Sequence, residues 1–157
     1  MSQRDTDGGG VRAELRVPVN RVSVELTLGD GRCLRGTVFV PPGCHVEELL
    51  GRSAAFLPVE QDGTVVLYAP GAIACVAVRE ETAEPHPDDL PLAARALAVR
   101  LRSGTVVQGE VRYVAWSGAM RTADLLNEPA ATIALYGQRG VVQHVAKAHV
   151  ESVEEVV

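Results

Sequence analysis

The segment Val22–Val40 reads VSVELTLGDGRCLRGTVFV, and its alternating apolar and polar residues predict two β-strands joined by a tight turn. Paired strands must place their apolar side chains on one face. A two-residue turn would set the apolar residues of one strand opposite the polar residues of the other. A three-residue loop, Gly29-Asp30-Gly31, keeps the faces together and gives Gly31 the left-handed backbone position. The expected pairs are Leu26 with Leu34, Val24 with Gly36, and Val22 with Val38.

The segment Leu97–Tyr113, LAVRLRSGTVVQGEVRY, repeats this construction, with both glycines displaced by 73 positions, from 31 to 104 and from 36 to 109. Gly36 and Gly109 fall on the inward-facing set of their strands, where glycine indicates a sharp bend or a close backbone approach. We therefore predict an internal duplication with two units of about 60 residues, near the lower size limit for an independent domain. The expected pairs in the second copy are Val99 with Val107 and Leu97 with Gly109.

The remaining apolar runs predict a short helix and three further strands in each unit. The helices are expected at Val46–Leu50 and Ala123–Leu126, with Thr122 as N-cap and with Gly51 and Asn127 in left-handed C-terminal positions. The strands are expected at residues 55–59, 64–68 and 73–78, and at residues 132–136, 141–145 and 150–156.

The predicted fold is mainly β, with two tandem five-stranded small barrels, each carrying one short helix after its second strand. Between the units lies an acidic segment that contains three prolines, which favours an extended linker. The predicted organisation is a disordered tail at residues 1–12, a first repeat at 13–79, the linker at 80–94 and a second repeat at 95–157.

Bulk composition narrows the classes of function. The chain has 25 valines but only 4% aromatic residues, which favours strands, and its formal net charge of −5 supplies no broad basic field for nucleic acid. It contains no run of about 18 apolar residues, and its first ten residues lack the apolar core of a signal peptide. We therefore expect a cytoplasmic protein without a membrane partner. Three cysteines without zinc-like spacing, Cys33, Cys44 and Cys75, are expected to be reduced thiols.

The hairpins at Val24–Val40 and Leu97–Tyr113 resemble the first motif of the small-barrel class that includes bacterial Sm-like proteins. The segment Val145–Val153 resembles the apolar, basic, apolar spacing of the second motif, although Ala146-Lys147 and Ala69-Pro70 stand where that family carries a basic residue followed by glycine. The tandem form also resembles an uncharacterised bacterial family of duplicated small β-domains. The resemblance implies a small β-barrel (SH3-like) fold, and Asn127 alone invites comparison with the residues that bind uridine.

The chain carries no motif of an enzyme: no nucleophile elbow, no phosphate-binding glycine loop and no zinc-protease helix. We expect no catalytic residue and no cofactor. Cys44 and His45 could offer metal ligands together with Cys75 or His149, but Met120 and Arg121 replace the first two in the second copy. We therefore predict no metal site.

Trp116, the only tryptophan, lies with Met120 in a segment unique to the second copy. Both are candidate binding residues for a protein partner, although the same tryptophan could simply cover an open barrel end. The leading hypothesis is a non-catalytic binding or assembly module that associates through strand edges or through this loop. The alternative is an Sm-like RNA-binding protein, with RNA contacted by Arg32, Arg35, Arg100, Arg102 and Arg112.

Overall fold

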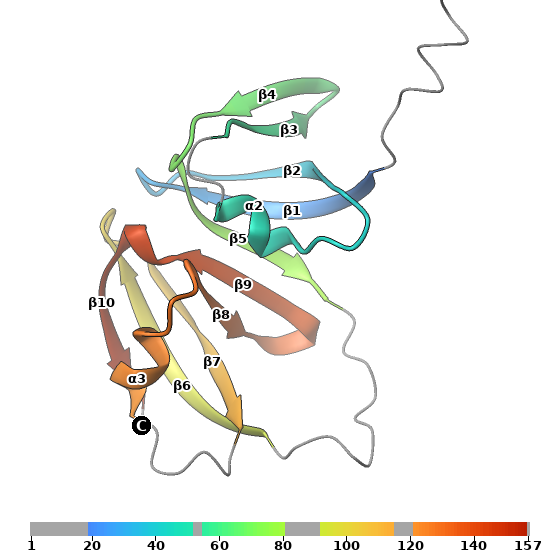
Figure 1. Ribbon diagram of the computed structural model, residues 1–157. Helices are drawn as coiled ribbons and strands as arrows, with labels where there is room; N and C mark the ends of the chain where they lie inside the picture. Colours follow the sequence, from blue (N-terminus) through green and yellow to red (C-terminus); the bar gives the residue numbers. More distant parts are fainter. Residues whose placement is uncertain (1–18, 52–54, 81–91, 115–120, 157) are drawn as a thin grey trace, which may run out of the picture.

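The computed structural model describes residues 19–51, 55–80, 92–114 and 121–156. These residues form ten strands, two short α-helices and two single-turn 3₁₀ helices (Figure 1). The first half comprises β1 (Asn20–Leu28), β2 (Cys33–Val40), α2 (Val46–Leu50), β3 (Leu57–Gln61), β4 (Thr64–Tyr68) and β5 (Ile73–Arg79). The second half comprises β6 (Leu92–Leu101), β7 (Val106–Val114), α3 (Thr122–Leu126), β8 (Thr132–Tyr136), η1 (Gln138–Gly140), β9 (Val141–Ala146), η2 (Lys147–His149) and β10 (Val150–Glu155).

Both hairpins have the predicted register. Leu26 lies opposite Leu34 on β1 and β2, and Val99 lies opposite Val107 on β6 and β7. The loops contain three residues, and each ends in a glycine with positive φ, 95° at Gly31 and 93° at the corresponding glycine of the second half. The parity argument is therefore confirmed: Leu26 and Val99 are fully buried.

The strands form one antiparallel sheet with the order β10-β6-β7-β8-β9-β5-β1-β2-β3-β4. Within each half the fifth strand is followed by the first, second, third and fourth, so both halves have the same internal order. The halves are joined because β9 pairs with β5 (Figure 1). The prediction of two tandem small barrels is not confirmed, because the described strands form one continuous and open sheet with β4 and β10 at its ends. The sequence leaves open whether the two repeats form separate barrels or one fused sheet, and the structure has the single sheet.

Two apolar cores lie one on each side of this junction. The first is lined by β1, β2, β3, β5 and α2, and the second by β6, β7, β8 and β9. Strand β5 belongs to both, because Val76 and Val78 pack in the first core whereas Ala74 and Cys75 pack in the second. Burial of a valine side chain such as Val76 contributes about 1.5–3 kcal/mol. Because β5 also supplies side chains to the second core, it couples the stability of the two halves.

The close approach predicted at Gly36 and Gly109 is present in the structure. A Cβ added to Gly36 would lie 2.5 Å from Val59 Cγ1, and one added to Gly109 would lie 2.8 Å from Leu135 Cβ. The third strand of each half therefore presses onto the glycine of the second strand.

Two details of the helix ends differ from the prediction. Gly51 has φ −77° and Asn127 has φ −86°, so neither adopts the left-handed conformation. Helices of one turn can end without that reversal because their few carbonyl groups are accessible to other donors. Thr122 is the first helical residue rather than the cap, and the Asp124 carboxylate accepts a hydrogen bond of 3.0 Å from the Arg121 backbone N–H. In the ranges that the structure describes, no helix has the length and apolar character needed to cross a bilayer.

Candidate assembly edges

The junction between β5 and β9 is the best-defined interface between the halves. Its register places Val76 opposite His144 and Val78 opposite Val142. All four side chains are buried, and His144 and Val142 are only 4% and 3% exposed. The face of the junction on which these four residues lie is therefore shielded from solvent.

Contacts outside the strand pairing reinforce this junction. His149 Nε2 donates a hydrogen bond of 2.5 Å to the Gly71 carbonyl. The backbone N–H of Glu80, directly after β5, donates a hydrogen bond of 2.8 Å to the Gly140 carbonyl. Because these contacts flank the paired strands, the ends of the β5–β9 ladder are fixed as well as its middle.

Strand β10 occupies in the second half the position that β5 occupies in the first. Val76 pairs with Leu26 on β1, and Val153 pairs with Val99 on β6. Both pairings contain a register shift at the same place. In the first half it lies between Thr27 and Leu28, and in the second half it lies opposite the equivalent residues, Arg100 and Leu101. The free edge of β10 is thus equivalent to the edge of β5 that β9 covers.

Strand β4 is in the same way equivalent to β9. Val65 pairs with Glu60 on β3, and Val142 pairs with Tyr136 on β8. Glu60 and Tyr136 themselves face equivalent positions of β2 and β7. Val65 therefore corresponds to Val142.

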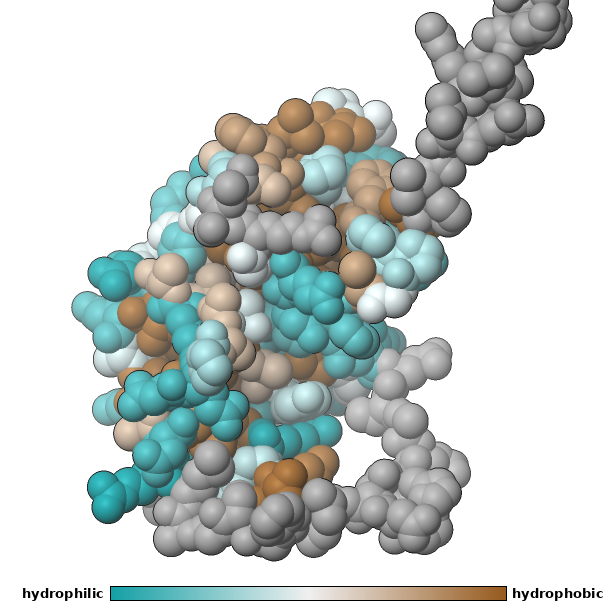
Figure 2. Space-filling view, in the orientation of Figure 1, coloured by the Kyte–Doolittle hydropathy of each residue, from teal (hydrophilic) through white to brown (hydrophobic). Residues whose placement is uncertain are grey.

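Two residues further along these strands, Leu67 corresponds to His144. Their surroundings differ sharply: Val65 and Leu67 are 54% and 62% exposed, whereas Val142 and His144 are buried. Apolar residues gather over the β3–β4 hairpin at the top of the molecule (Figure 2). The free edge thus exposes apolar side chains at the two positions that the internal junction covers.

The arginines predicted to bind RNA lie partly on two neighbouring turns and partly on separate strands. The β1–β2 and β6–β7 turns lie side by side, since a Cβ on Gly31 would stand 3.3 Å from Thr105 Oγ1. Arg32 and Arg102 therefore lie on neighbouring turns, and Arg102 donates a 3.0 Å hydrogen bond to the Ala148 carbonyl. Arg100 is exposed on β6, Arg35 lies on β2 and Arg112 lies on β7.

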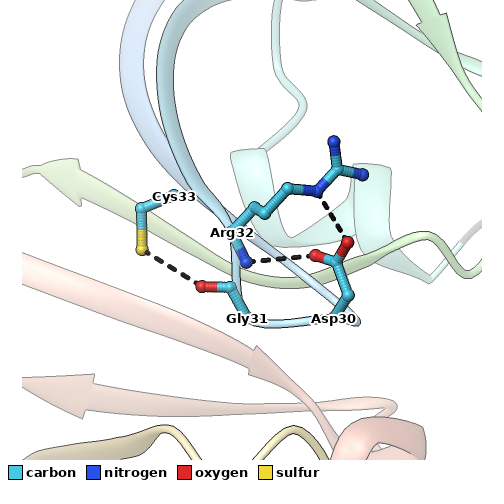
Figure 3. A network of polar contacts seen from close by, with 4 residues as sticks. All are labelled: Asp30, Gly31, Arg32 and Cys33. Carbon is cyan, nitrogen blue, oxygen red and sulfur yellow. Dashed lines mark hydrogen bonds and ion pairs between the residues drawn. The ribbon is translucent and has the colours of Figure 1, made fainter.

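Several of these guanidinium groups already have partners. Arg32 Nε lies 2.6 Å from Asp30 Oδ2 (Figure 3), and Arg35 Nε lies 3.8 Å from Glu25 Oε2. The backbone N–H of Arg32 also donates to the Asp30 carboxylate and is the main cause that lowers the pKa of Asp30. Arg112 stacks 4.0 Å above the Tyr136 ring. With the hydrogen bond of Arg102 to Ala148, the guanidinium groups at four of the five positions thus have partners within the chain.

The cysteines carry no disulfide. Cys33 is exposed, whereas Cys75 is buried, and burial raises the pKa of the Cys75 thiol to about 12. Cys75 therefore stays a neutral thiol near pH 7, a form that binds metals poorly. Trp116 and Met120, the candidate binding residues for a partner, lie outside the described residues.

One polar cluster was not found by sequence reasoning. Glu47 on α2, Glu80 after β5 and His144 on β9 place their ligand atoms within 4.8 Å of one another. The sequence suggests a solvated helix face for Glu47 and a strand border for His144, and the three residues are too far apart along the chain to form a motif. Among the described residues, Cys44 and His45 form no such group with Cys75 or His149.

Comparison of the chain with protein-family models, with curated proteins and with solved structures finds no match.

Proposed function

We propose that this protein is a non-catalytic assembly module whose copies associate edge to edge, with β4 of one chain pairing with β10 of the next. The observation that carries the proposal is the contrast between exposed Val65 and Leu67 and their buried equivalents Val142 and His144. Exposed apolar residues on an unpaired edge strand favour addition of another strand. The internal β5–β9 junction supplies the template for that addition.

The template also sets the register of the proposed interface. Since Val76 lies opposite His144, Val153 of one chain would lie opposite Leu67 of the next. By the same rule, Ser152 would face Tyr68 and Glu154 would face Val66. The central pair is apolar on both sides, which favours burial.

The helix that flanks the junction supports the same arrangement. At the internal junction, Glu47 of α2 approaches His144, with 3.9 Å between Glu47 Oε2 and His144 Nε2. The equivalent residue of α3 is Ala123, and the equivalent of His144 is Leu67. A polar contact inside the chain would thus be replaced by an apolar contact between chains, which suits the exposed leucine.

The proposed contact is heterologous, because different edges of the two chains meet. Such a contact leaves one β4 and one β10 edge free at the ends of any open assembly, so association continues until a ring closes. Strand β10 carries Glu151, Glu154 and Glu155, and charged edges suppress indiscriminate pairing. These carboxylates favour a selective, reversible association over aggregation.

The experiment compares Leu67→Lys with Val106→Lys. Val106 is 44% exposed, similar to the two β4 residues, but lies on β7 in the interior of the sheet. Light scattering coupled to size exclusion, over a wide range of concentrations, should show larger species for the wild type and for Val106→Lys. Leu67→Lys should weaken association roughly tenfold to a hundredfold through loss of one buried leucine contact. A wild-type chain that stays monomeric, or equal effects of both variants, would contradict the proposal.

A further inference from the structure

We infer that Glu47, Glu80 and His144 form a binding site for a divalent transition-metal ion at the junction of the halves. This site is separate from the free edges and does not depend on edge-to-edge assembly. Glu47 lies on α2 and Glu80 follows β5, whereas His144 comes from β9 of the other half. An ion bound there would connect three elements across the junction.

The distances suit a common ion. His144 Nε2 lies 2.9 Å from Glu80 Oε1 and 3.9 Å from Glu47 Oε2, and the three ligand atoms lie within 4.8 Å of one another. Ligand atoms about 2.0–2.2 Å from a zinc ion stand at comparable separations from one another. Little movement is therefore needed to admit a metal.

Charge balance within the cluster also calls for a cation. His144 Nε2 donates a hydrogen bond to the Glu80 carboxylate, and Glu47 Oε2 is buried without a hydrogen-bond partner. Within the described residues, no lysine or arginine forms an ion pair with Glu47 or Glu80. A buried carboxylate oxygen without a partner is costly, and a divalent ion would neutralise it.

Among the residues that the structure describes, the polar cluster has no polar counterpart in the other half of the chain. The positions equivalent to Glu47 and His144 in the other half are Ala123 and Leu67. Leu67 is 62% exposed on β4, which lies at the end of the sheet, so it has no neighbour equivalent to β5 among the described strands. The polar cluster belongs to the internal junction and is not a common feature of both halves.

The donor set defines the class of ion. One imidazole nitrogen and two carboxylate oxygens suit zinc, cobalt, manganese or iron in the divalent state. The side chains of Glu47 and Glu80 are 36% and 41% exposed, so an ion has access from solvent and water can complete its coordination. His144 Nδ1 is buried without a hydrogen-bond partner, and metal at Nε2 would place the ring proton there. We therefore expect weaker binding than at a site whose histidine is anchored by a second carboxylate.

The test uses the full chain after removal of metals with a chelator. Zinc is titrated by calorimetry, and cobalt is added as a spectroscopic probe. Glu47→Gln removes one ligand with little change of shape, and Glu48→Gln on the same helix is the matched control with the same change of charge. We expect one zinc per chain, a loss of affinity of about tenfold or more in Glu47→Gln, and wild-type affinity in Glu48→Gln.

Three outcomes would overturn the inference. The first is the absence of zinc binding to the folded wild type. The second is equal affinity in the wild type and Glu47→Gln. The third is an intense thiolate-to-cobalt absorption band, which would place the ion on a cysteine instead. Circular dichroism of each variant distinguishes a lost ligand from a lost fold, and His144→Gln provides a second ligand variant if Glu47→Gln fails to fold.

Discussion

Gly109 and Leu135 are in such close contact that a Cβ on the glycine would stand 2.8 Å from the Leu135 Cβ and 3.2 Å from its carbonyl carbon. One of these atoms belongs to the backbone, so a rotamer change cannot relieve the clash. Gly109→Ala should therefore destabilise the protein by about 1–3 kcal/mol, as overpacked core substitutions do. Urea unfolding measures this loss.

Gly51→Ala is the matched control for that substitution. The φ of Gly51, −77°, suits any residue, and a Cβ added there would stand 3.6 Å from the Glu48 carbonyl oxygen. The free energy of unfolding of Gly51→Ala should equal that of the wild type or exceed it by up to about 1 kcal/mol. Similar losses in both variants would show that the close approach of β8 to β7 is not what the glycine serves.

Cys75 predicts a loss of stability at alkaline pH. Burial raises the pKa of its thiol from 9.0 to about 12 in the folded chain. The folded state therefore holds the proton more tightly than the unfolded state, so its contribution to stability is complete below pH 9 and declines as pH rises toward 12. Between pH 8 and pH 10.5, the unfolding midpoint should decrease more for the wild type than for Cys75→Ala. Parallel pH dependence in the two proteins would rule out this origin.

The register of the proposed interface can be tested with cysteine pairs in a Cys33→Ser background. Val153→Cys combined with Leu67→Cys should give disulfide-linked multimers under mild oxidation, because the internal pair Val76–His144 occupies this position. The control is Val153→Cys combined with Val66→Cys, which is displaced by one residue. Non-reducing electrophoresis compares the two, and more cross-linking in the control would mean a different register.

The RNA alternative predicts a distinct result. Titration with labelled single-stranded RNA at two salt concentrations should show affinity that falls as salt rises if the five arginines neutralise phosphates. Since Arg32 and Arg35 face carboxylates and Arg112 stacks on Tyr136, we expect no such binding. Binding at low salt that is lost in Arg100→Ala and Arg102→Ala would establish the alternative.

The hairpins could be predicted because side-chain parity restricts a two-stranded ribbon to one register. Leu26 opposite Leu34 follows from the sequence of that segment alone. The pairing of β5 with β9 could not be obtained in this way, because it joins segments from separate halves and no turn limits their register. One signal was nevertheless present: residues 73–78 form an unbroken apolar run, which is typical of a strand buried on both faces, whereas Gln143 and His144 interrupt the apolar residues at 141–146.

The cluster of Glu47, Glu80 and His144 depends on that unforeseen pairing. His144 reaches the two carboxylates only because β9 lies beside β5. Without the junction, each residue has an ordinary local explanation on a short helix, in a linker or at a strand. Sequence reasoning located the elements but not the place where they meet.

Strand β5 contributes to both cores, with Ile73, Val76 and Val78 in the first and Ala74 and Cys75 in the second. A fragment that began after residue 79 would leave the second core without Ala74 and Cys75, and a fragment that ended at residue 79 would expose the same two residues to water. Each half therefore needs the other to complete or cover its core, and we expect the two halves to unfold together.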